Sequence, residues 1–303
     1  MDEVATGSCS LIFALCAPPK YPDTVVFMLE RIAEFIPSNL LRFIGRLQYR
    51  IPVLGPTIRR VAARIASGEG AIQRGVGVGL KFHSTVPVAG YRLGTTEPEL
   101  QEALAEHLKK GDVVYDLGAN VGFYTLLSAR LVGSEGHVYA FEPYPKSAET
   151  TRHNLAINGF DHGTVINKAI ADKPGLEWFE MDTTPTTFRL GEDRGRKGIL
   201  VEVTSIDALL EEGEVRAPDF LKIDVEGAEK RVLLGMKTTL GLHRPTILCE
   251  VHYAVSDFEQ FVVDELGPLG YEIRALDGGP IPRSGARFHV LITPKKPFPL
   301  RGC

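Results

Sequence analysis

The sequence predicts an α/β fold in which a mostly parallel β-sheet carries helices on both faces. From about residue 113 onward, short apolar runs alternate with segments of helical periodicity, which is typical of chains that wind such a sheet. The last two apolar runs, at 271–276 and 288–292, are joined by a loop rich in glycine and proline, with no helix between them. A connection of this kind indicates that the last strand runs antiparallel.

The other elements follow from local signals. A hairpin is expected within residues 70–94, and Thr-Glu-Pro-Glu at 96–99 is typical of a capping box that begins a helix. A loosely patterned insertion with Trp178 and Phe188 follows the third strand. Further strands are expected at 113–117, 138–141, 165–170, 201–203, 220–223 and 246–249. Helices are expected at about 123–132, 146–158, 206–212, 227–240 and 256–266.

Residues 1–70 are predicted to form an N-terminal helical extension, which precedes a domain of residues 71–303. From Arg31 to Arg64 this extension contains seven arginines and a single acid, Glu34. The simpler interpretation is a solvated basic face on helices that cap the main domain. The alternative is a surface for peripheral contact with anionic lipid or with a phosphorylated substrate.

Composition narrows the class of protein. The chain has 303 residues, of which 44% are hydrophobic and 24% charged, as in ordinary globular proteins. Its net charge of -4 provides no generic basic surface for nucleic acid. The four cysteines lack zinc-like spacing, and the apolar run 11–17 is too short to span a bilayer and has no basic residue before it. We therefore expect a cytoplasmic protein that has no nucleic-acid partner.

A glycine-containing loop follows the first strand of the predicted sheet. Residues 116–122 read Asp-Leu-Gly-Ala-Asn-Val-Gly, and sheets of this kind bind ligands at the carboxyl ends of their strands. The pattern differs from the Gly-x-Gly-x-x-Gly of pyrophosphate-binding loops. The acid at the strand end, Asp116, disfavours a pyrophosphate and suits a cofactor with an ammonium group and a sulfonium.

An acid also ends the second strand. Glu142 lies 26 residues after Asp116, a plausible spacing for one strand-helix-strand unit, and precedes Pro143. A carboxylate at this position can accept hydrogen bonds from both hydroxyls of a ribose. Alone, Glu142 is better read as a solvated acid that opens a loop. Together with the glycine loop, it favours a nucleoside ligand.

Ionisable residues follow two later strands. Asp224 and Glu226 come after the strand at 220–223, and Glu250 and His252 are two apart, so they share one face of an extended segment. Such a group can supply a general base, hydrogen bonds to a substrate or a cation site. The structural alternatives are a first-turn acid for Glu226, a surface acid for Glu229 and a packing role for His252.

Together these segments resemble the FkbM-type family of class I S-adenosylmethionine-dependent methyltransferases, over roughly residues 93–295. The matching pieces are LGTTEPEL, GDVVYDLGANVGFYTLLSA, VYAFEPYP, NLAINGF, NKAIAD, PDFLKIDVEGAEKRVLLGM and PTILCEVH, of which KIDVEGAE is the most discriminating. The resemblance implies a Rossmann-like, doubly wound sheet of seven strands with one antiparallel strand. It also implies S-adenosylmethionine as cofactor and an oxygen as methyl acceptor, usually a hydroxyl of a sugar, glycolipid or polyketide.

The resemblance assigns roles to individual residues. Glu142 would take the ribose, backbone at 169–172 would meet the adenine, and Asp224, Glu226, Glu250 and His252 would face the acceptor. The implied cofactor-binding set is Asp116, Gly118, Ala119, Asn120, Gly122, Phe123, Glu142, Pro143, Ala169, Asp172 and Asp224.

His252 is the expected base, because its unperturbed pKa suits neutral pH, and Asp224 is the alternative. A divalent cation on Asp224, Glu226 or Glu250 is less favoured, since no ligand spacing requires it.

Three rival functions are open on the sequence alone. An NAD(P)-dependent oxidoreductase on a Rossmann-like sheet needs a pyrophosphate loop, which the Asp-led loop 116–122 does not resemble. A nucleic-acid methyltransferase is disfavoured by the acidic balance and by the lack of an aromatic-proline tetrad after the fourth strand. A non-catalytic module that only binds S-adenosylmethionine is disfavoured by the acids at three strand ends.

Overall fold

The structure is a computed structural model that describes residues 68–86, 88–181, 188–191 and 197–295. All of these belong to a unit of residues 66–303. The predicted helical extension and its arginine-rich face lie almost wholly outside the described residues, so both stay predictions. None of the described helices is long and apolar enough to cross a bilayer.

A mixed sheet of seven strands forms the centre of the described part of the chain, in the order β12-β13-β11-β10-β3-β4-β5. All neighbouring pairs from β11 to β5 are parallel, and β13 runs antiparallel to both β11 and β12. The α/β class and the single antiparallel strand are therefore confirmed. The strands are β3 (Val113–Leu117), β4 (His137–Phe141), β5 (Gly163–Ile166), β10 (Phe220–Ile223), β11 (Thr246–Val251), β12 (Tyr271–Ala275) and β13 (Phe288–Pro294).

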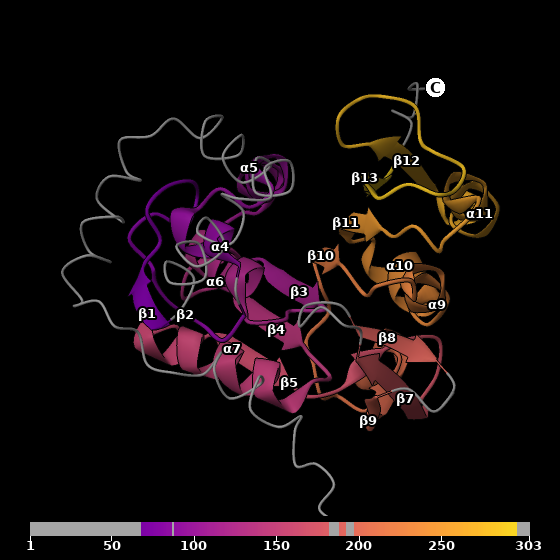
Figure 1. The fold of residues 1–303 in the computed structure, drawn as a ribbon. Helices are drawn as coiled ribbons and strands as arrows, with labels where there is room; N and C mark the ends of the chain where they lie inside the picture. Colours follow the sequence, from indigo (N-terminus) through magenta and orange to yellow (C-terminus); the bar gives the residue numbers. More distant parts are fainter. Residues whose placement is uncertain (1–67, 87, 182–187, 192–196, 296–303) are drawn as a thin grey trace, which may run out of the picture. The chain divides into compact units, whose positions relative to one another are not determined.

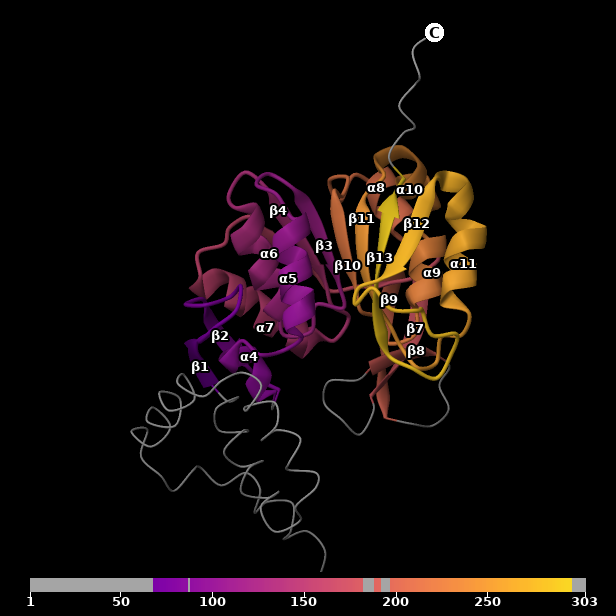
Figure 2. The ribbon, with the colours of Figure 1, turned by 90° about the horizontal axis from the view of Figure 1, so that it is seen from above.

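Helices cover both faces of this sheet (Figures 1 and 2). Alternate side chains of β3 enter different cores: Val114 belongs to the core that contains residues of α5 and α6, and Tyr115 to the core that contains residues of α9 and α11. The helices of the first face are α4 (Ala89–Leu93), α5 (Pro98–His107), α6 (Phe123–Val132) and α7 (Pro145–Ile157). Those of the second are α8 (Ile206–Glu211), α9 (Glu229–Leu234), α10 (Lys237–His243) and α11 (Phe258–Glu265).

The order of the strands indicates where a ligand would bind. From β3 the chain continues to β4 and β5 on one side, and it returns to β10 and β11 on the other. In open sheets of this type, ligands bind outside the carboxyl ends of the strands at the point where the order reverses. The ends of β3 and β10, at Leu117 and Ile223, lie side by side at this point.

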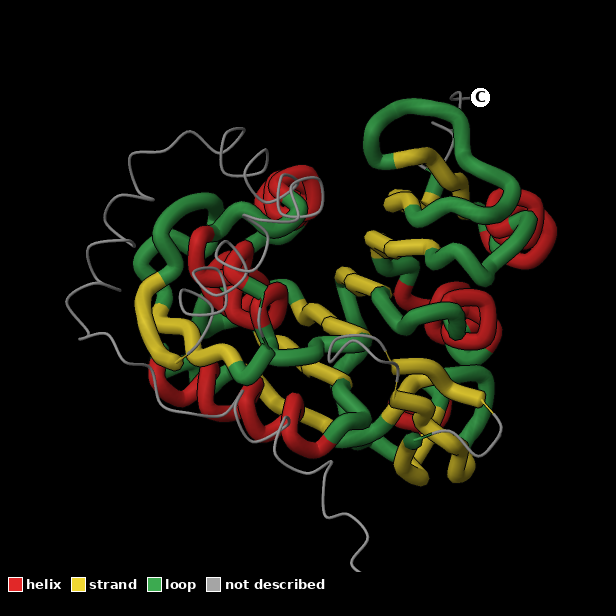
Figure 3. Tube along the Cα trace, in the orientation of Figure 1, coloured by secondary structure: helices red, strands yellow, loops and turns green. Residues whose placement is uncertain are grey.

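A second sheet of four strands stands beside the first within the described ranges, in the order β6-β9-β7-β8 (Figure 3). Its strands are β6 (Ala169–Ile170), β7 (Gly175–Met181), β8 (Phe188–Gly191) and β9 (Gly198–Thr204). The prediction of one strand at 165–170 is wrong, because β5 ends at Ile166 and β6 pairs with β9 in the other sheet. Between them, the Asn167 amide donates to the carbonyls of Glu142 (2.6 Å) and Pro143 (3.0 Å), which turns the chain.

Three further predictions need correction. The helix expected at 227–240 is two helices, α9 and α10, because the Asp207 carboxylate accepts the N–H groups of Thr238 and Thr239 (2.9 Å each) and so starts a new helix. No capping box forms among the described residues at α5, which begins at Pro98 and whose N-cap residue, Glu97, makes no side-chain cap. The hairpin within 70–94 pairs β1 (Gly68–Ala71) with β2 (Lys81–Ser84), and its last residues form α4 instead.

Candidate active site

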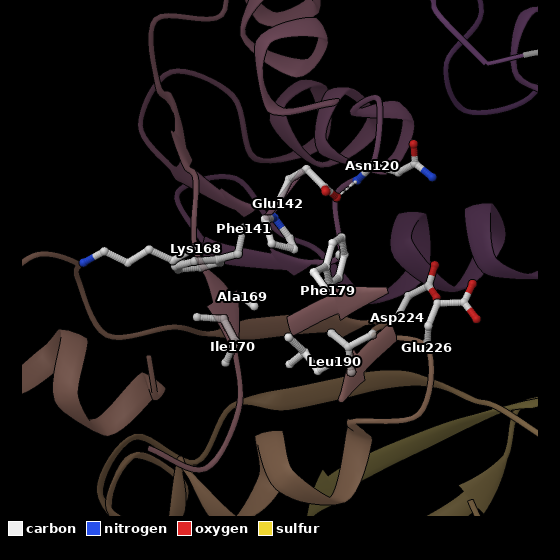
Figure 4. A pocket seen from close by; sticks show the side chains of 13 residues that line it. Asn120, Phe141, Glu142, Lys168, Ala169, Ile170, Phe179, Leu190, Asp224 and Glu226 are labelled. Carbon is white, nitrogen blue, oxygen red and sulfur yellow. Dashed lines mark hydrogen bonds between the residues drawn. The ribbon is translucent and has the colours of Figure 1, made fainter. Parts of the chain in front are cut away.

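A first cavity of about 570 Å³, including the space at its mouth, opens where β3, β4 and β10 end (Figure 4). The second sheet forms one of its walls through β6, β7 and β8. All of its lining residues lie between positions 118 and 226 of the chain. They are Gly118, Asn120, Phe141, Glu142, Pro143, Lys168, Ala169, Ile170, Phe179, Leu190, Asp224, Val225 and Glu226.

Glu142 lies at the end of β4 and is held by two backbone N–H groups. Its Oε2 accepts from Asn120 (2.8 Å; Figure 4), and its Oε1 accepts from Tyr144 (2.8 Å). Burial raises the pKa of Glu142 to about 7, although both N–H groups act in the opposite direction. Each carboxylate oxygen accepts more than one hydrogen bond, so capacity remains for hydroxyl groups of a ligand in the cavity.

Apolar side chains form the far end of this cavity. Phe179 of β7 and Leu190 of β8 lie beside Ala169 and Ile170 of β6 (Figure 4). This surface suits a flat aromatic base. The sequence predicted Ala169 at this site and missed Phe179 and Leu190. The alternation of apolar and polar residues in β7 and β8 is weak, and no local pattern indicates that these strands pair beside Ala169.

Asp172, which was expected near the adenine, is not among the residues that line either cavity in the described part of the chain. Its carboxylate accepts from Nε of Arg231 on α9 (2.7 Å), and the same guanidinium pairs with Glu177 of β7. Asp172 therefore ties α9 to the second sheet.

The glycine loop after β3 packs against the end of β10. Gly118 has φ of 78°, and a Cβ added there would lie 1.9 Å from the carbonyl oxygen of Asp224. At Gly122, with φ of 83°, a Cβ would lie 2.7 Å from Cγ2 of Thr151. Glycine is thus required at both positions by left-handed backbone and by neighbouring protein atoms. Gly118 lines both cavities and Gly122 lines neither of those that the described residues form.

Asp116 lies beneath the loop and is fully buried. Its Oδ2 accepts from the Thr125 hydroxyl (2.6 Å), and its Oδ1 is 3.3 Å from Nζ of Lys222 in β10. Neither cavity in the described ranges is lined by Asp116, so its direct contact with a cofactor stays a prediction. Asp116 is therefore connected to the site through its ion pair with Lys222, which also contacts Asp224.

Lys222 is the buried cation that the sequence reading missed. Besides Asp116, it contacts Oδ2 of Asp224 (3.2 Å) and the Gly118 carbonyl (3.3 Å). Burial alone would lower the pKa of Lys222, but the two carboxylates outweigh it and raise that pKa above its ordinary value. Its position inside the apolar run of β10 gave no sign of the ion pair with Asp116, because Asp116 lies on the neighbouring strand.

A second cavity of about 850 Å³, again including the space at its mouth, lies on the other side of the loop. It shares Gly118, Asn120, Asp224 and Glu226 with the first cavity, so these residues mark the junction of the two. The remaining lining residues are Val88, Tyr91, Thr96, Glu97, Ala119, Phe123, Tyr124, Lys222 and Arg287.

His252 lies behind the junction and is surrounded by carboxylates. Its Nδ1 is 2.6 Å from Oε1 of Glu229, and its Nε2 is 3.2 Å from Glu226, 3.5 Å from Glu250 and 3.6 Å from Asp224. Burial alone would lower the pKa of His252, but the hydrogen bonds with Glu226 and Glu229 and the nearby charges raise it to about 10. The expectation that His252 keeps its ordinary pKa is wrong, and at neutral pH it is an imidazolium.

Two carboxylates of this cluster are almost wholly buried. Glu229 is fully buried under His252, which corrects its interpretation as a surface acid of α9. Glu250 is 2% exposed, and its carboxylate contacts Arg287 and lies 3.4 Å from Nε2 of His289. Neither Glu250 nor His252 lines a cavity among the described residues, so both act on the site from behind Asp224 and Glu226.

Two groups of described side chains place possible metal-ligand atoms within 4.8 Å of one another, namely Glu97 with Glu250 and His289, and Asp224 with Glu226 and His252. Arg287 already pairs with both acids of the first group, and a protonated His252 stands within the second. The less favoured cation thus stays a prediction.

Comparison with known proteins identifies the family. The Methyltransferase FkbM domain matches residues 116–277. The hexuronic acid methyltransferase AglP of Haloferax volcanii is 28% identical over 160 residues, which span 52% of this chain and 64% of that protein. The 31-O-demethyl-FK506 methyltransferase FkbM of Streptomyces tacrolimicus is 28% identical over 181 residues, which span 48% and 67%. These matches span about two thirds of each relative's length.

Solved structures give a weaker likeness. A methyltransferase FkbM from Methylobacillus flagellatus aligns with a TM-score of 0.40 at 16% identity, covering 60% of this chain and 43% of that one. The domain match spans more than half of the chain and contains the glycine loop, Glu142 and the Asp224 segment. The chain belongs to the FkbM methyltransferase domain family.

Proposed function

We propose that the chain is an S-adenosylmethionine-dependent methyltransferase that methylates a hydroxyl oxygen of a small molecule, such as a sugar, a glycolipid or a polyketide. The observation that carries this proposal is the junction of the two cavities. A site for a nucleoside on one side meets a larger polar cavity on the other at Gly118, Asn120, Asp224 and Glu226.

The residues of the first cavity fit the cofactor. Glu142 retains acceptor capacity for the ribose hydroxyls, and the surface of Phe179, Leu190 and Ala169 suits the adenine. The carboxylates of Asp224 and Glu226 at the junction favour the positive charge of a sulfonium. When bound, the cofactor supplies an activated methyl group.

The names of two relatives support a small-molecule acceptor, and the first of them names an oxygen. One is a 31-O-demethyl-FK506 methyltransferase, and the other is a hexuronic acid methyltransferase. The second cavity of this chain agrees with an acceptor that carries hydroxyl groups, because Asp224, Glu226 and Arg287 offer both hydrogen-bond donors and acceptors along its wall.

Asp224 is the group that we assign to the acceptor proton. It lines both cavities, whereas His252 lies behind it and is already protonated. Burial alone would raise the pKa of Asp224, but Lys222 and the His252 imidazolium lower it, so this carboxylate is ionised at neutral pH. A hydroxyl in the second cavity would donate its hydrogen bond to Asp224, which would hold the proton as the new carbon–oxygen bond forms.

His252 then acts as a positioning residue. Glu229 fixes its Nδ1, and its Nε2 faces Asp224 and Glu226. The positive charge of the imidazolium lowers the pKa of Asp224, and its contacts limit the directions in which both carboxylates can turn. Alignment of the acceptor oxygen with the methyl group depends on such fixed partners.

Transfer of a labelled methyl group tests the proposal. S-adenosylmethionine carrying a radiolabelled methyl group would be incubated with the full chain and with lipid, glycan, RNA and protein fractions. We expect label in the glycan, lipid or small-molecule fraction, with an O-methyl group identified in the product by NMR. The Asp224→Asn variant should bind cofactor and lose transfer. Label in RNA or protein, or an N-methyl product, would overturn the assignment of the acceptor.

Cofactor choice is tested separately. The thermal midpoint of unfolding would be compared with S-adenosylhomocysteine, NAD and NADP. We expect stabilisation by S-adenosylhomocysteine alone. Stabilisation by NAD or NADP would favour the oxidoreductase, and stabilisation by S-adenosylhomocysteine without any methyl transfer would favour a non-catalytic binding module.

A further inference from the structure

Glu97 occupies an unusual backbone position at the start of α5. Its φ is 41°, in the left-handed region that few residues other than glycine adopt, and its side chain caps no N–H group among the described residues. The side chain instead lines the second cavity. Non-glycine residues in this region are strained, and such strain is concentrated at functional sites. Asn120 and Glu226, at the junction of the cavities, share this feature.

A series of contacts connects Glu97 to the junction of the two cavities. Its Oε2 accepts from the Tyr124 hydroxyl (2.6 Å), and Nζ of Lys222 lies 5.2 Å from the centre of the Tyr124 ring. Lys222 in turn contacts the Gly118 carbonyl (3.3 Å) and Asp224 (3.2 Å). Glu97 is therefore linked to the junction through Tyr124 and Lys222.

The ammonium group at the amino-acid end of a cofactor can donate to carbonyl, hydroxyl or carboxylate oxygens, and a carboxylate also offsets its charge. Asp116 is buried beneath the loop and paired with Lys222, so it lies outside the lining of both cavities that the described residues form. Asp224 and Glu226 lie at the junction, where the sulfonium belongs. Beyond the junction, the acid of the second cavity is Glu97.

Aromatic rings line the second cavity beside Glu97. Tyr91, Phe123 and Tyr124 form a continuous aromatic wall, with ring centres 5.0 Å apart for Tyr91 and Phe123 and 5.2 Å apart for Phe123 and Tyr124. Aromatic faces attract ammonium groups. Arg287 donates to Oε1 of Glu97 (2.7 Å), which fixes the carboxylate and leaves each oxygen able to accept a further hydrogen bond.

We propose that Glu97 binds the α-ammonium group of S-adenosylmethionine. The inference rests on the proposed function, since it requires that cofactor, and it adds a residue outside the family match of residues 116–277. It also gives a role to the left-handed backbone at Glu97, which turns the side chain into the cavity instead of over the end of α5.

Calorimetric titration with three ligands tests this assignment. S-adenosylhomocysteine carries the ammonium group, its analogue without the amino group lacks it, and methylthioadenosine lacks the whole amino-acid end. We expect Glu97→Gln to weaken binding of S-adenosylhomocysteine by about tenfold or more, as for loss of a hydrogen bond between charged groups. Binding of the two other ligands should be unchanged. Glu99→Gln is the matched control, because Glu99 is an exposed acid two residues further along.

Each other outcome contradicts the assignment. An equal loss for all three ligands would show that Glu97 only supports the shape of the site, and no loss for S-adenosylhomocysteine would show that it makes no contact. Failure of the unaltered chain to bind S-adenosylhomocysteine or methylthioadenosine would instead refute the proposed function. If Glu97→Gln unfolds, Glu97→Gly, which relieves the left-handed strain, should fold and show the same selective loss.

Discussion

The two cavities differ in where their walls come from. Every residue that lines the first lies between positions 118 and 226, inside the family match of residues 116–277. The second also draws on residues outside that match, namely Val88, Tyr91, Thr96, Glu97 and Arg287. The matched domain thus contains every lining residue of the proposed nucleoside site, whereas the wall of the second cavity also includes segments before and after that domain. Similarity within the domain therefore says more about the cofactor than about the acceptor.

The cavities also differ in charge. Away from the junction, the carboxylate that lines the first cavity is Glu142, which is held by backbone N–H groups beside an apolar surface. Ionised side chains crowd the second and the cluster behind it, where carboxylates outnumber Lys222, Arg287 and the His252 imidazolium. Titration should therefore affect the two cavities in different pH ranges.

The largest effect is expected at Gly118, which both cavities share. In Gly118→Ala the new Cβ would meet the Asp224 carbonyl and the backbone would be strained at φ of 78°. We expect the free energy of unfolding to fall by about 3 kcal/mol or more, measured by denaturant titration, and binding of S-adenosylhomocysteine to be lost.

Gly111→Ala is the matched control for backbone strain. Gly111 also has positive φ, 90°, but a Cβ there meets no atom within 4 Å. Its cost should be about 1 kcal/mol, from backbone alone. Equal costs for the two variants would contradict the close packing between the glycine loop and the end of β10.

Acid should weaken the first cavity. Because the pKa of Glu142 is about 7, its ionised fraction falls from about nine tenths at pH 8 to about one tenth at pH 6. If the ionised form accepts the ribose hydroxyls, the Kd of S-adenosylhomocysteine should rise by about tenfold across this range, measured by calorimetry. Glu142→Gln should bind more weakly at pH 8 and show no such dependence.

A rise in pH should lower the contribution of Glu142 to stability, although it should strengthen cofactor binding. The folded pKa of Glu142, about 7, exceeds its ordinary value of 4.5, so the folded protein binds the proton more tightly than the unfolded chain. Its contribution to the free energy of unfolding is present below pH 4.5 and is lost as pH rises through 7.

A cofactor affinity that does not change between pH 6 and 8 would count against Glu142 as the ribose acceptor.

The cluster behind the second cavity should respond only to alkali. Since the pKa of His252 is raised to about 10, turnover at saturating cofactor should be flat from pH 7 to 9 and fall toward pH 10. Glu229→Gln removes a charge that holds the proton, so the fall should move toward neutral pH by about one unit. A rise in turnover between pH 6 and 7.5 would instead indicate that His252 acts as a base with an ordinary pKa.

The smallest effect is expected at Asp172. Its pair with Arg231 is partly exposed, and neither cavity is lined by it in the described part of the chain. In Asp172→Asn we expect at most about 1 kcal/mol of lost stability and less than about a twofold change in the Kd of S-adenosylhomocysteine. Phe179→Ala, which removes part of the adenine surface, should weaken binding several-fold in the same assay. A larger effect at Asp172 would restore its predicted contact with the adenine.

Local patterns were sufficient for the central elements. The strands at Val113–Leu117 and Phe220–Ile223 and the helix at Phe123–Val132 lie where apolar runs and periodicity predicted them. Glu142 was also found at the end of its strand, because that position follows from strand length alone. Patterns of this kind succeed where neighbours along the chain decide the conformation, as in a buried strand followed by a glycine turn.

Contacts between distant segments could not be predicted from local patterns. Lys222 pairs with Asp116 across 106 positions of the chain, and Glu229 is buried because His252 returns to it from β11. The sequence predicts one strand at residues 165–170, although the first part of this segment belongs to one sheet and the last part to the other. Burial and charge at these positions depend on which strands become neighbours, and that is not encoded in local spacing.

The sequence by itself determined the α/β class, the order of most elements and the acids at the ends of the strands, because each depends on short-range periodicity and on glycine. Only the tertiary structure decided which acids are available to a ligand. It buried Asp116 under Lys222, turned His252 from an expected base into an imidazolium, and brought Glu97 and Arg287 to one cavity from opposite ends of the domain. The physical reason is that pKa and exposure are set by neighbours in space, which folding alone brings together.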